Sequence, residues 1–256
     1  MNDILKVTLQ DRVCQVLMNR PEKKNALTLE MYQGLTDAMI AADNNPEVRV
    51  IILGSTGDSF CAGNDIADFI AAVSRPDAIK VPLFFLQTLA ALKTPLIAAV
   101  PGAAVGIGST VLLHCDLVVA SDQARFQLPF ARLGLVPEGG SSLLMPQLVG
   151  HRRAFELLVL GDSFSAETAS DLGLVNWVVT PDTLQTRALD EATKLAALAP
   201  EAVRQSKAML RSHTQSQLEA VLVAEVNQFA ERLTSDEARE ALMAFMEKRA
   251  PDFSRF

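Results

Sequence analysis

The sequence predicts an α/β fold followed by a helical C-terminal region. Up to about Val179, short runs rich in β-forming residues alternate with patterns typical of helices, which indicates a layered α/β core. After Pro181 these strand signals disappear, and Ala, Leu, Glu, Gln, Lys and Arg dominate as far as Lys248. We therefore predict a core over residues 1–195 and a C-terminal helical region over residues 196–256.

Individual elements of both parts can be located. The predicted strands, mostly buried, are residues 13–19, 48–55, 95–102 and 116–121. Thr28 can cap a helix that runs to about Asp43 and stops near Pro46. Three or four helices are expected after Pro181, with Pro200 opening one and the polar stretch 213–217 interrupting the pattern.

Composition limits the classes of partner. The chain has 256 residues, enough for a large core, and its net charge of −7 makes nucleic acid an unfavourable partner. Residues 1–20 lack a signal-peptide core, and the longest apolar stretches fall short of the roughly 20 residues that a membrane span needs. Three widely spaced cysteines fit a reducing compartment, and the ending "SRF" matches the peroxisomal SKL signal poorly. We expect a cytoplasmic protein that does not enter a membrane.

Several common catalytic motifs are absent from the sequence. It contains no P-loop and no GxSxG nucleophile elbow, and "GAAVGIG" (102–108) has the wrong glycine order for a dinucleotide fingerprint. The three histidines, His114, His151 and His213, show no metal-ligand spacing and are expected to be exposed or structural. We predict no metal.

Two glycine-bearing stretches follow strands and have the same form. They are "SFCAGNDI" (59–66) and "VPGAAVGIGSTVLLHCD" (100–116), the second of which runs into an apolar pattern typical of a helix. Small residues there would let a ligand approach the main chain, so that the N–H groups of Asn64 and Ile107 could point at one acceptor. Unpaired donors at a helix start favour negative charge, which suits an oxyanion. Ordinary turn chemistry is the alternative interpretation of both stretches.

A single carboxylate, Glu138, stands in the apolar segment "LVPEGGSS" (135–142). Burial among apolar neighbours would raise its pKa, whereas the start of a helix near residues 139–142 would lower it, and the sequence does not decide between them. Glu138 is therefore either a tuned catalytic group or a structural acid at a helix N-terminus.

Four motifs together resemble the crotonase, or enoyl-CoA hydratase/isomerase, superfamily. They are "NRPEKKNAL" (19–27), "SFCAGNDI", "GAAVGIGSTVLLHCDLVVAS" (102–121) and "LGLVPEGGSS" (133–142), and "AETASDLGLVNWVV" (166–179) and "APEAVRQSKAML" (199–210) extend the match. The resemblance implies a spiral of ββα units, a C-terminal helical region used in a homotrimer or a dimer of trimers, and an acyl-CoA thioester as substrate. Coenzyme A is then part of the substrate, and no separate cofactor is expected.

The resemblance also implies roles for residues. The N–H groups of Asn64 and Ile107 would hold the thioester oxygen, and Glu138 stands where Δ3,Δ2-enoyl-CoA isomerases of this superfamily keep their single catalytic glutamate. Hydratases carry two glutamates at positions that Thr110 and Phe130 occupy here, and neither residue is a base near neutral pH. Substrate contacts are implied for Lys23, Ala62, Gly63, Asp65, Ile66, Gly106, Phe130 and Leu133.

We therefore predict a Δ3,Δ2-enoyl-CoA isomerase, and two alternatives stay open. One is an isomerase of a ring-derived acyl-CoA thioester, of the kind formed in phenylacetate degradation. The other is a non-catalytic member of the superfamily that binds RNA or serves in assembly, although the net acidity gives no basic stripe for RNA.

Overall fold

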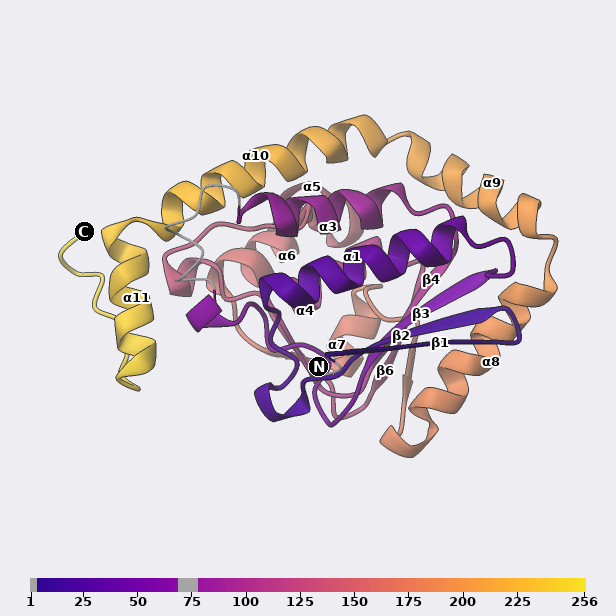
Figure 1. The fold of residues 1–256 in the computed structure, drawn as a ribbon. Helices are drawn as coiled ribbons and strands as arrows, with labels where there is room; N and C mark the ends of the chain where they lie inside the picture. The colour runs from indigo at the N-terminus through magenta and orange to yellow at the C-terminus, as the bar shows by residue number, and fades with distance from the viewer. Residues whose placement is uncertain (1–3, 69–77) are drawn as a thin grey trace.

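A six-stranded sheet forms the base of the fold. The computed structural model describes residues 4–68 and 78–256. The strands of this sheet are β1 (Leu5–Gln10), β2 (Val13–Met18), β3 (Val50–Ser55), β4 (Leu96–Val100), β6 (Leu117–Ser121) and β9 (Trp177–Val179). They lie in the order β1-β2-β3-β4-β6-β9, and every neighbouring pair is parallel except the β1–β2 hairpin (Figure 1). The four predicted strands are confirmed, whereas β1 and β9 had not been predicted.

A second, smaller sheet gives the chain its spiral course. It consists of β5 (Ala103–Val105), β7 (Arg125–Gln127) and β8 (Phe164–Ser165), in that order. Strands β4 and β6 of the large sheet are each followed directly by a strand of the small one, and an isolated bridge between Cys61 and Ala104 gives β3 the same continuation. The chain thus alternates between the two sheets, which is the predicted ββα repeat.

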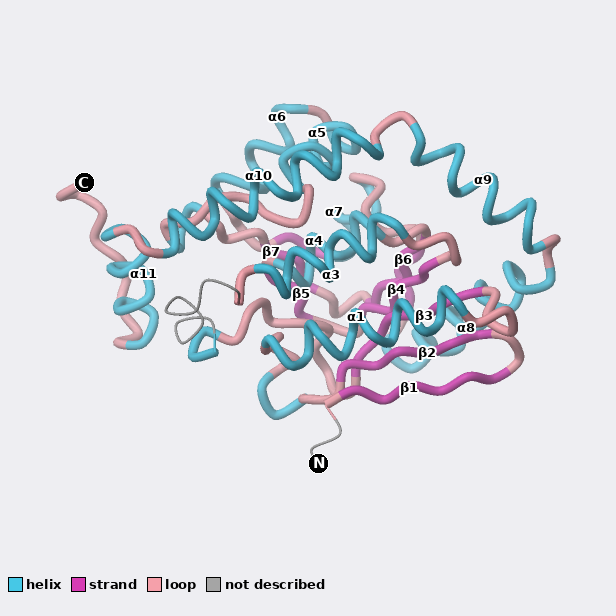
Figure 2. Tube along the Cα trace, turned by 45° about the horizontal axis from the view of Figure 1, so that its top comes forward, coloured by secondary structure: helices cyan, strands magenta, loops and turns pink. Residues whose placement is uncertain are grey.

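Helices cover both faces of the large sheet. On one face lie α1 (Leu29–Asn44) and α3 (Lys80–Ala91), side by side, and on the other lies α8 (Leu184–Ala197) (Figures 1 and 2). Alternate residues of β3 point to opposite faces, so that Ile51 packs in the first core cluster and Ile52 packs against α8. Thr28 caps α1 as predicted, because its hydroxyl accepts a hydrogen bond from the N–H of Met31 at 3.2 Å.

The C-terminal region consists of α9 (Pro200–Ser212), α10 (Gln215–Leu233) and α11 (Asp236–Met246). With α8 these make four helices after Pro181, where three or four were expected, and the predicted interruption separates α9 from α10. Helix α10 passes over α3 and α5 (Ser141–Val149), as the yellow end of the ribbon in Figure 1 shows. Among the described residues, no helix is long and apolar enough to cross a membrane.

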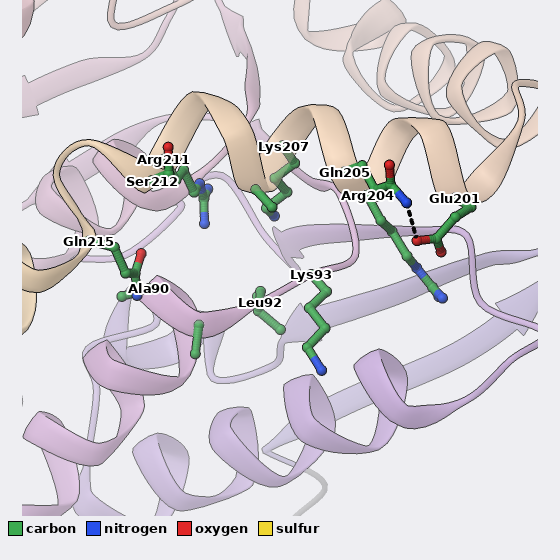
Figure 3. Close-up of a pocket in the computed structure, with 12 residues that line it drawn as sticks. Ala90, Leu92, Lys93, Glu201, Arg204, Gln205, Lys207, Arg211, Ser212 and Gln215 are labelled. Atoms are coloured by element: carbon green, nitrogen blue, oxygen red, sulfur yellow. Dashed lines mark hydrogen bonds between the residues drawn. The ribbon is translucent and has the colours of Figure 1, made fainter.

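Helix α9 is anchored by ion pairs. Lys207 and Arg211 reach from α9 toward the core, beside a pocket of about 440 Å³ between α9 and the end of α3 (Figure 3). The two side chains bind the carboxylate of Asp116 at 2.6 and 3.0 Å, and that carboxylate also accepts from the N–H of Leu96 at 2.8 Å. Asp116 is therefore a structural acid.

Short helices complete the fold. The predicted apolar helix after the second glycine stretch is only two brief turns, α4 and η2, because the chain re-enters the large sheet at β6. The short elements are η1 (Pro21–Lys23), α4 (Ile107–Thr110), η2 (Val111–His114), η3 (Ala131–Leu133), α6 (His151–Phe155), η4 (Glu156–Leu160), α7 (Ala166–Asp171) and η5 (Pro181–Thr183).

Candidate active site

The two glycine-bearing stretches lie against each other. The carbonyl oxygen of Cys61 accepts a hydrogen bond from the N–H of Val105 at 2.9 Å. Gly108 is so close to the first stretch that a Cβ atom at this position would lie 2.4 Å from the same oxygen. Glycine at position 108 therefore allows the two main chains to approach closely.

The N–H groups of Asn64 and Ile107 are not used by the main chain around them. Ile107 is the first residue of α4, so its N–H has no acceptor within the helix. Around Asn64, the oxygen of Gly63 accepts from Leu27 and the N–H of Asp65 donates to Leu27, both at 2.8 Å, so the intervening N–H points away from Leu27. Within residues 4–68 and 78–256 neither donor has a hydrogen-bond acceptor, as an oxyanion site requires.

The side chain of Asn64 is held from helix α1. The hydroxyl of Tyr32 donates to the Oδ1 atom of Asn64 at 2.6 Å, and Tyr32 is fully buried. Burial raises the pKa of Tyr32 well above its usual range, and the nearby carboxylate of Glu138 and thiol of Cys61 add to this. Tyr32 therefore stays protonated as a donor, and it links the first glycine stretch to the surroundings of Glu138.

Glu138 is buried, with a side chain that points at helix α4. It lies in the loop of residues 134–140, which we call the Glu138 loop, between η3 and α5. The hydroxyl of Thr110 donates to Glu138 Oε1 at 2.7 Å, and Thr110 is the last residue of the helix that begins with Ile107. Gly139 and Gly140 follow with φ of +73° and +75°, in the left-handed region that favours glycine, which explains the two glycines.

The surroundings make Glu138 an unusually strong base. Burial raises the pKa of Glu138 to about 8, the hydrogen bond from Thr110 opposes this rise, and the negative charge of Glu225 adds to it. The sequence left open whether burial or the start of helix α5 would dominate. Burial dominates, and the amides at the start of α5 do not bind the carboxylate of Glu138. Instead Gly140 N–H and Ser142 N–H donate to the Glu225 carboxylate, at 2.6 and 2.9 Å.

Two further contacts hold the Glu138 loop. His114 donates from Nε2 to the carbonyl oxygen of Gly139 at 2.8 Å, and burial lowers the pKa of His114 to about 4, which keeps the ring neutral. The carbonyl oxygen of His114 in turn accepts from Arg211 at 2.6 Å. At the other end of the loop, Arg232 of α10 donates to the oxygen of Gly134 at 3.1 Å.

The carboxylate of Asp65, an implied substrate contact, orients the loop that carries Asn64. Its carboxylate binds Arg20 at 2.8 Å and accepts from the N–H of Asp68 at 3.1 Å. Burial acts to raise the pKa of Asp65, but the hydrogen bonds from Arg20 and from main-chain N–H groups outweigh it and lower the pKa. Asp65 thus stays ionised and shapes the stretch that carries Asn64.

The other predicted substrate contacts lie at different depths. Lys23 is exposed on η1, and Ala62, Ile66, Gly106 and Leu133 are partly exposed. Gly63 is buried against the oxygen of Val105. Phe130 is only 3% exposed and packs among Leu128, Met145 and Phe229. Their contact with a substrate stays a prediction.

Sequence reasoning missed Glu225, Tyr32 and the role of His114. Glu225 did leave a signal, because it lies on the buried side of α10 with Leu218, Leu222, Val226 and Phe229. A carboxylate at such a position is rarely buried unless it has partners. Tyr32 left no comparable signal, since a buried tyrosine on an apolar helix face is ordinary.

Comparison with known proteins identifies the family. The family model described as enoyl-CoA hydratase/isomerase matches residues 8–255. The chain belongs to the enoyl-CoA hydratase/isomerase family. A solved structure of an enoyl-CoA hydratase/isomerase from Pseudoalteromonas atlantica T6c is 42% identical, covers 98% of this chain and 99% of its own, and superposes with a TM-score of 0.92. The predicted crotonase fold is thereby confirmed.

Relatives of this enoyl-CoA hydratase/isomerase carry several activities in their names. "Probable enoyl-CoA hydratase echA8" of Mycobacterium bovis is 33% identical over 98% of both chains. Human "Enoyl-CoA delta isomerase 2" is 34% identical over 97% of this chain and 64% of the human protein. "1,2-epoxyphenylacetyl-CoA isomerase" of Escherichia coli is 32% identical over 94% of this chain and 95% of its own. This chain is similar to hydratases and isomerases alike.

Proposed function

We propose that this family member is a Δ3,Δ2-enoyl-CoA isomerase, with Glu138 as proton shuttle and the N–H groups of Asn64 and Ile107 as oxyanion donors. The observation that carries the proposal is the contact between Thr110 and Glu138. A hydroxyl stands at a position where hydratases of this superfamily have a glutamate, and it binds the buried carboxylate of Glu138 at 2.7 Å. One carboxylate is enough to move a proton between two carbons of one substrate.

The reaction can be written with these groups alone. The ionised Glu138 removes a proton from C2 of a 3-enoyl thioester, and the electrons of that C–H bond move onto the thioester oxygen to give a dienolate. The two main-chain N–H groups stabilise this oxyanion, a contribution that is about 2.7–4 kcal/mol for one donor in a serine protease. The dienolate then takes the proton from the Glu138 carboxylic acid at C4, the double bond forms between C2 and C3, and Glu138 is ionised again.

Hydration would need a second acid–base group to activate water. The superfamily's two hydratase positions hold Thr110 and Phe130, and Phe130 is buried among apolar side chains. Among the described residues, Glu225 is the other carboxylate that acts on Glu138 electrostatically, and its oxygens are occupied by the main-chain N–H groups of Gly140 and Ser142. These observations favour isomerisation over hydration.

A labelled straight-chain substrate tests the proposal directly. The purified protein is incubated with a 3-hexenoyl-CoA that carries deuterium at C2, and the products are separated and weighed by mass spectrometry. We expect a 2-enoyl product to which no water has been added. Part of the deuterium should appear at C4, because the same carboxylate takes it from C2 and delivers it to C4. A 3-hydroxyacyl product formed from 2-hexenoyl-CoA at a comparable rate would contradict the proposal.

A ring-derived acyl-CoA is the second candidate substrate. It is favoured by the similarity to the 1,2-epoxyphenylacetyl-CoA isomerase of Escherichia coli, which covers almost the whole of both chains. Comparing kcat/KM for 1,2-epoxyphenylacetyl-CoA and for straight-chain 3-enoyl-CoA esters separates the two. A preference for the cyclic substrate would leave the Glu138 chemistry in place and change the substrate class.

The pH dependence of the reaction should report the ionisation of Glu138. Because the carboxylate is the base and its pKa is about 8, kcat/KM should rise about tenfold per unit below that pH and level off above it. The measurement is kcat/KM for a straight-chain 3-enoyl-CoA between pH 5.5 and 9.5. Retention of the fold is checked first over the same pH range. A profile that is already flat at pH 6 would show that Glu138 is not the base or that its pKa is not raised.

Thr110→Val should move this profile to higher pH. The Thr110 hydroxyl stabilises the ionised form of Glu138, so its loss raises the pKa of the carboxyl further. We expect turnover at pH 7 to fall about threefold to tenfold and to recover near pH 9.5. Thr110→Ser, which keeps the hydroxyl, serves as the matched control and should leave the profile in place.

A further inference from the structure

Glu225 places a buried carboxylate directly behind the catalytic loop. It comes from helix α10, 85 residues after Gly140, and is 7% exposed. Its two oxygens accept from the main-chain N–H groups of Gly140 at 2.6 Å and of Ser142 at 2.9 Å. The Glu225 carboxylate thus binds the free N–H groups at the start of α5. The first of them, that of Gly140, lies only two residues after Glu138.

These contacts favour the ionised form of Glu225, against the effect of its burial. Burial raises the pKa of Glu225, and the hydrogen bonds from Ser142 and Gly140 oppose the rise. Partial positive charge at the start of α5 stabilises an anion in the same way. Within the described part of the chain, neither Glu138 nor Glu225 forms a salt bridge with a lysine or arginine.

The groups around Glu138 come from four elements. Thr110 of α4 donates to it, Tyr32 of α1 and the Cys61 thiol after β3 interact with it electrostatically, and Glu225 of α10 adds a negative charge. Burial raises the pKa of Cys61 to about 12 and that of Tyr32 beyond its usual range, so both are neutral when Glu138 titrates. His114, which holds Gly139, is neutral as well. Of these groups, Glu225 is the one whose negative charge raises the pKa of Glu138.

We propose that Glu225 is a positioning residue that keeps Glu138 strongly basic by binding the amides at the start of α5 and presenting a fixed negative charge behind it. The inference rests on the proposed function, since it assigns a purpose to the basicity of Glu138. Without the Glu225 carboxylate, the N–H groups of Gly140 and Ser142 would lose their anion, and their field would stabilise the ionised form of Glu138. The C-terminal region therefore adds to the strength of a base that the core carries.

Glu225→Gln tests this coupling with little change in shape. Glutamine has one oxygen that can accept from one of the two N–H groups, but it has no charge. We expect the rising limb of the kcat/KM profile to move to lower pH by about half a unit or more, opposite to Thr110→Val. The limiting rate at high pH should fall, because a weaker base removes the C2 proton more slowly. Affinity for unreactive butyryl-CoA should stay within about twofold.

Glu231→Gln is the matched control. Glu231 is exposed on the same helix, so its replacement changes the net charge equally without touching the Glu138 loop, and the profile should not move. If Glu225→Gln lowers turnover equally at every pH and leaves the limb in place, Glu225 has only a structural role and the inference is wrong.

Infrared titration makes the test independent of turnover and of the folding of one variant. The carboxyl band of Glu138, assigned by its loss in Glu138→Gln, should titrate at lower pH in Glu225→Gln than in the unaltered protein. Should Glu225→Gln not fold, Glu225→Ala, which also removes the charge, takes its place in the titration. The Glu138 band should again titrate at lower pH, because the coupling appears in the group that ionises second, and an unmoved band contradicts the coupling. If the Glu138 band moves in Glu225→Gln but the protein converts no enoyl-CoA, the coupling stands and only the proposed function is wrong.

Discussion

Glu138→Gln should lower isomerase turnover by about 10²–10⁴-fold, the usual contribution of a positioned acid–base group. Glutamine keeps the shape and can still accept the hydrogen bond from Thr110, but it cannot take a proton from C2. The affinity for butyryl-CoA, measured by calorimetry, should change little, because the oxyanion donors are main-chain groups. Turnover within about threefold of the unaltered protein would remove Glu138 from the mechanism.

The same substitution should stabilise the fold at alkaline pH. The pKa of Glu138 is about 8 in the folded chain against an ordinary value of 4.5, so the folded state holds a proton that the unfolded state has lost over this range. The contribution of Glu138 to stability is therefore present in full below pH 4.5 and is lost as the pH rises to about 8. Glu138→Gln should have a higher Tm than the unaltered protein at pH 9 and an equal one near pH 4.5. Glu47→Gln, at an exposed site, is the control and should show no such trend.

Gly108→Ala should lower kcat/KM by about 10²-fold or more. The added methyl group would lie 2.4 Å from the oxygen and 2.9 Å from the Cβ of Cys61, so the two glycine-bearing stretches must move apart. Ile107 immediately precedes Gly108, and its N–H would leave the position at which, by our proposal, it binds the thioester oxygen. Loss of one oxyanion donor costs about 10²–10³ in kcat. Steady-state kinetics with a 3-enoyl-CoA measure this loss.

Gly34→Ala provides the matched control. Its Cβ would meet only the tip of the flexible Leu5 side chain, at 2.8 Å, and alanine is favoured over glycine inside helix α1 by about 0.5–1 kcal/mol. Activity should be unchanged and Tm unchanged or raised. If Gly108→Ala behaved like Gly34→Ala, the close approach of the two stretches would not be needed for catalysis.

Local features of the chain were readable from the sequence. Periodicity and capping placed α1, the four buried strands and the break between α9 and α10, because each depends on neighbouring residues. Strands β1 and β9 were not predicted. Strand β1 is mostly exposed and β9 has only three residues, so neither shows a buried strand pattern. The same local reading singled out the Glu138 segment and the two glycine stretches.

What the sequence by itself determined is the alternation of strands and helices, the small residues that permit close contact of main chains, and a lone acid in an apolar segment. Tertiary structure alone decided how basic that acid is. Its pKa depends on burial, on the Thr110 hydroxyl 28 residues away and on the Glu225 charge from the C-terminal helices. Solvation and charge act through space, so their balance is fixed only when distant segments of the chain are brought together.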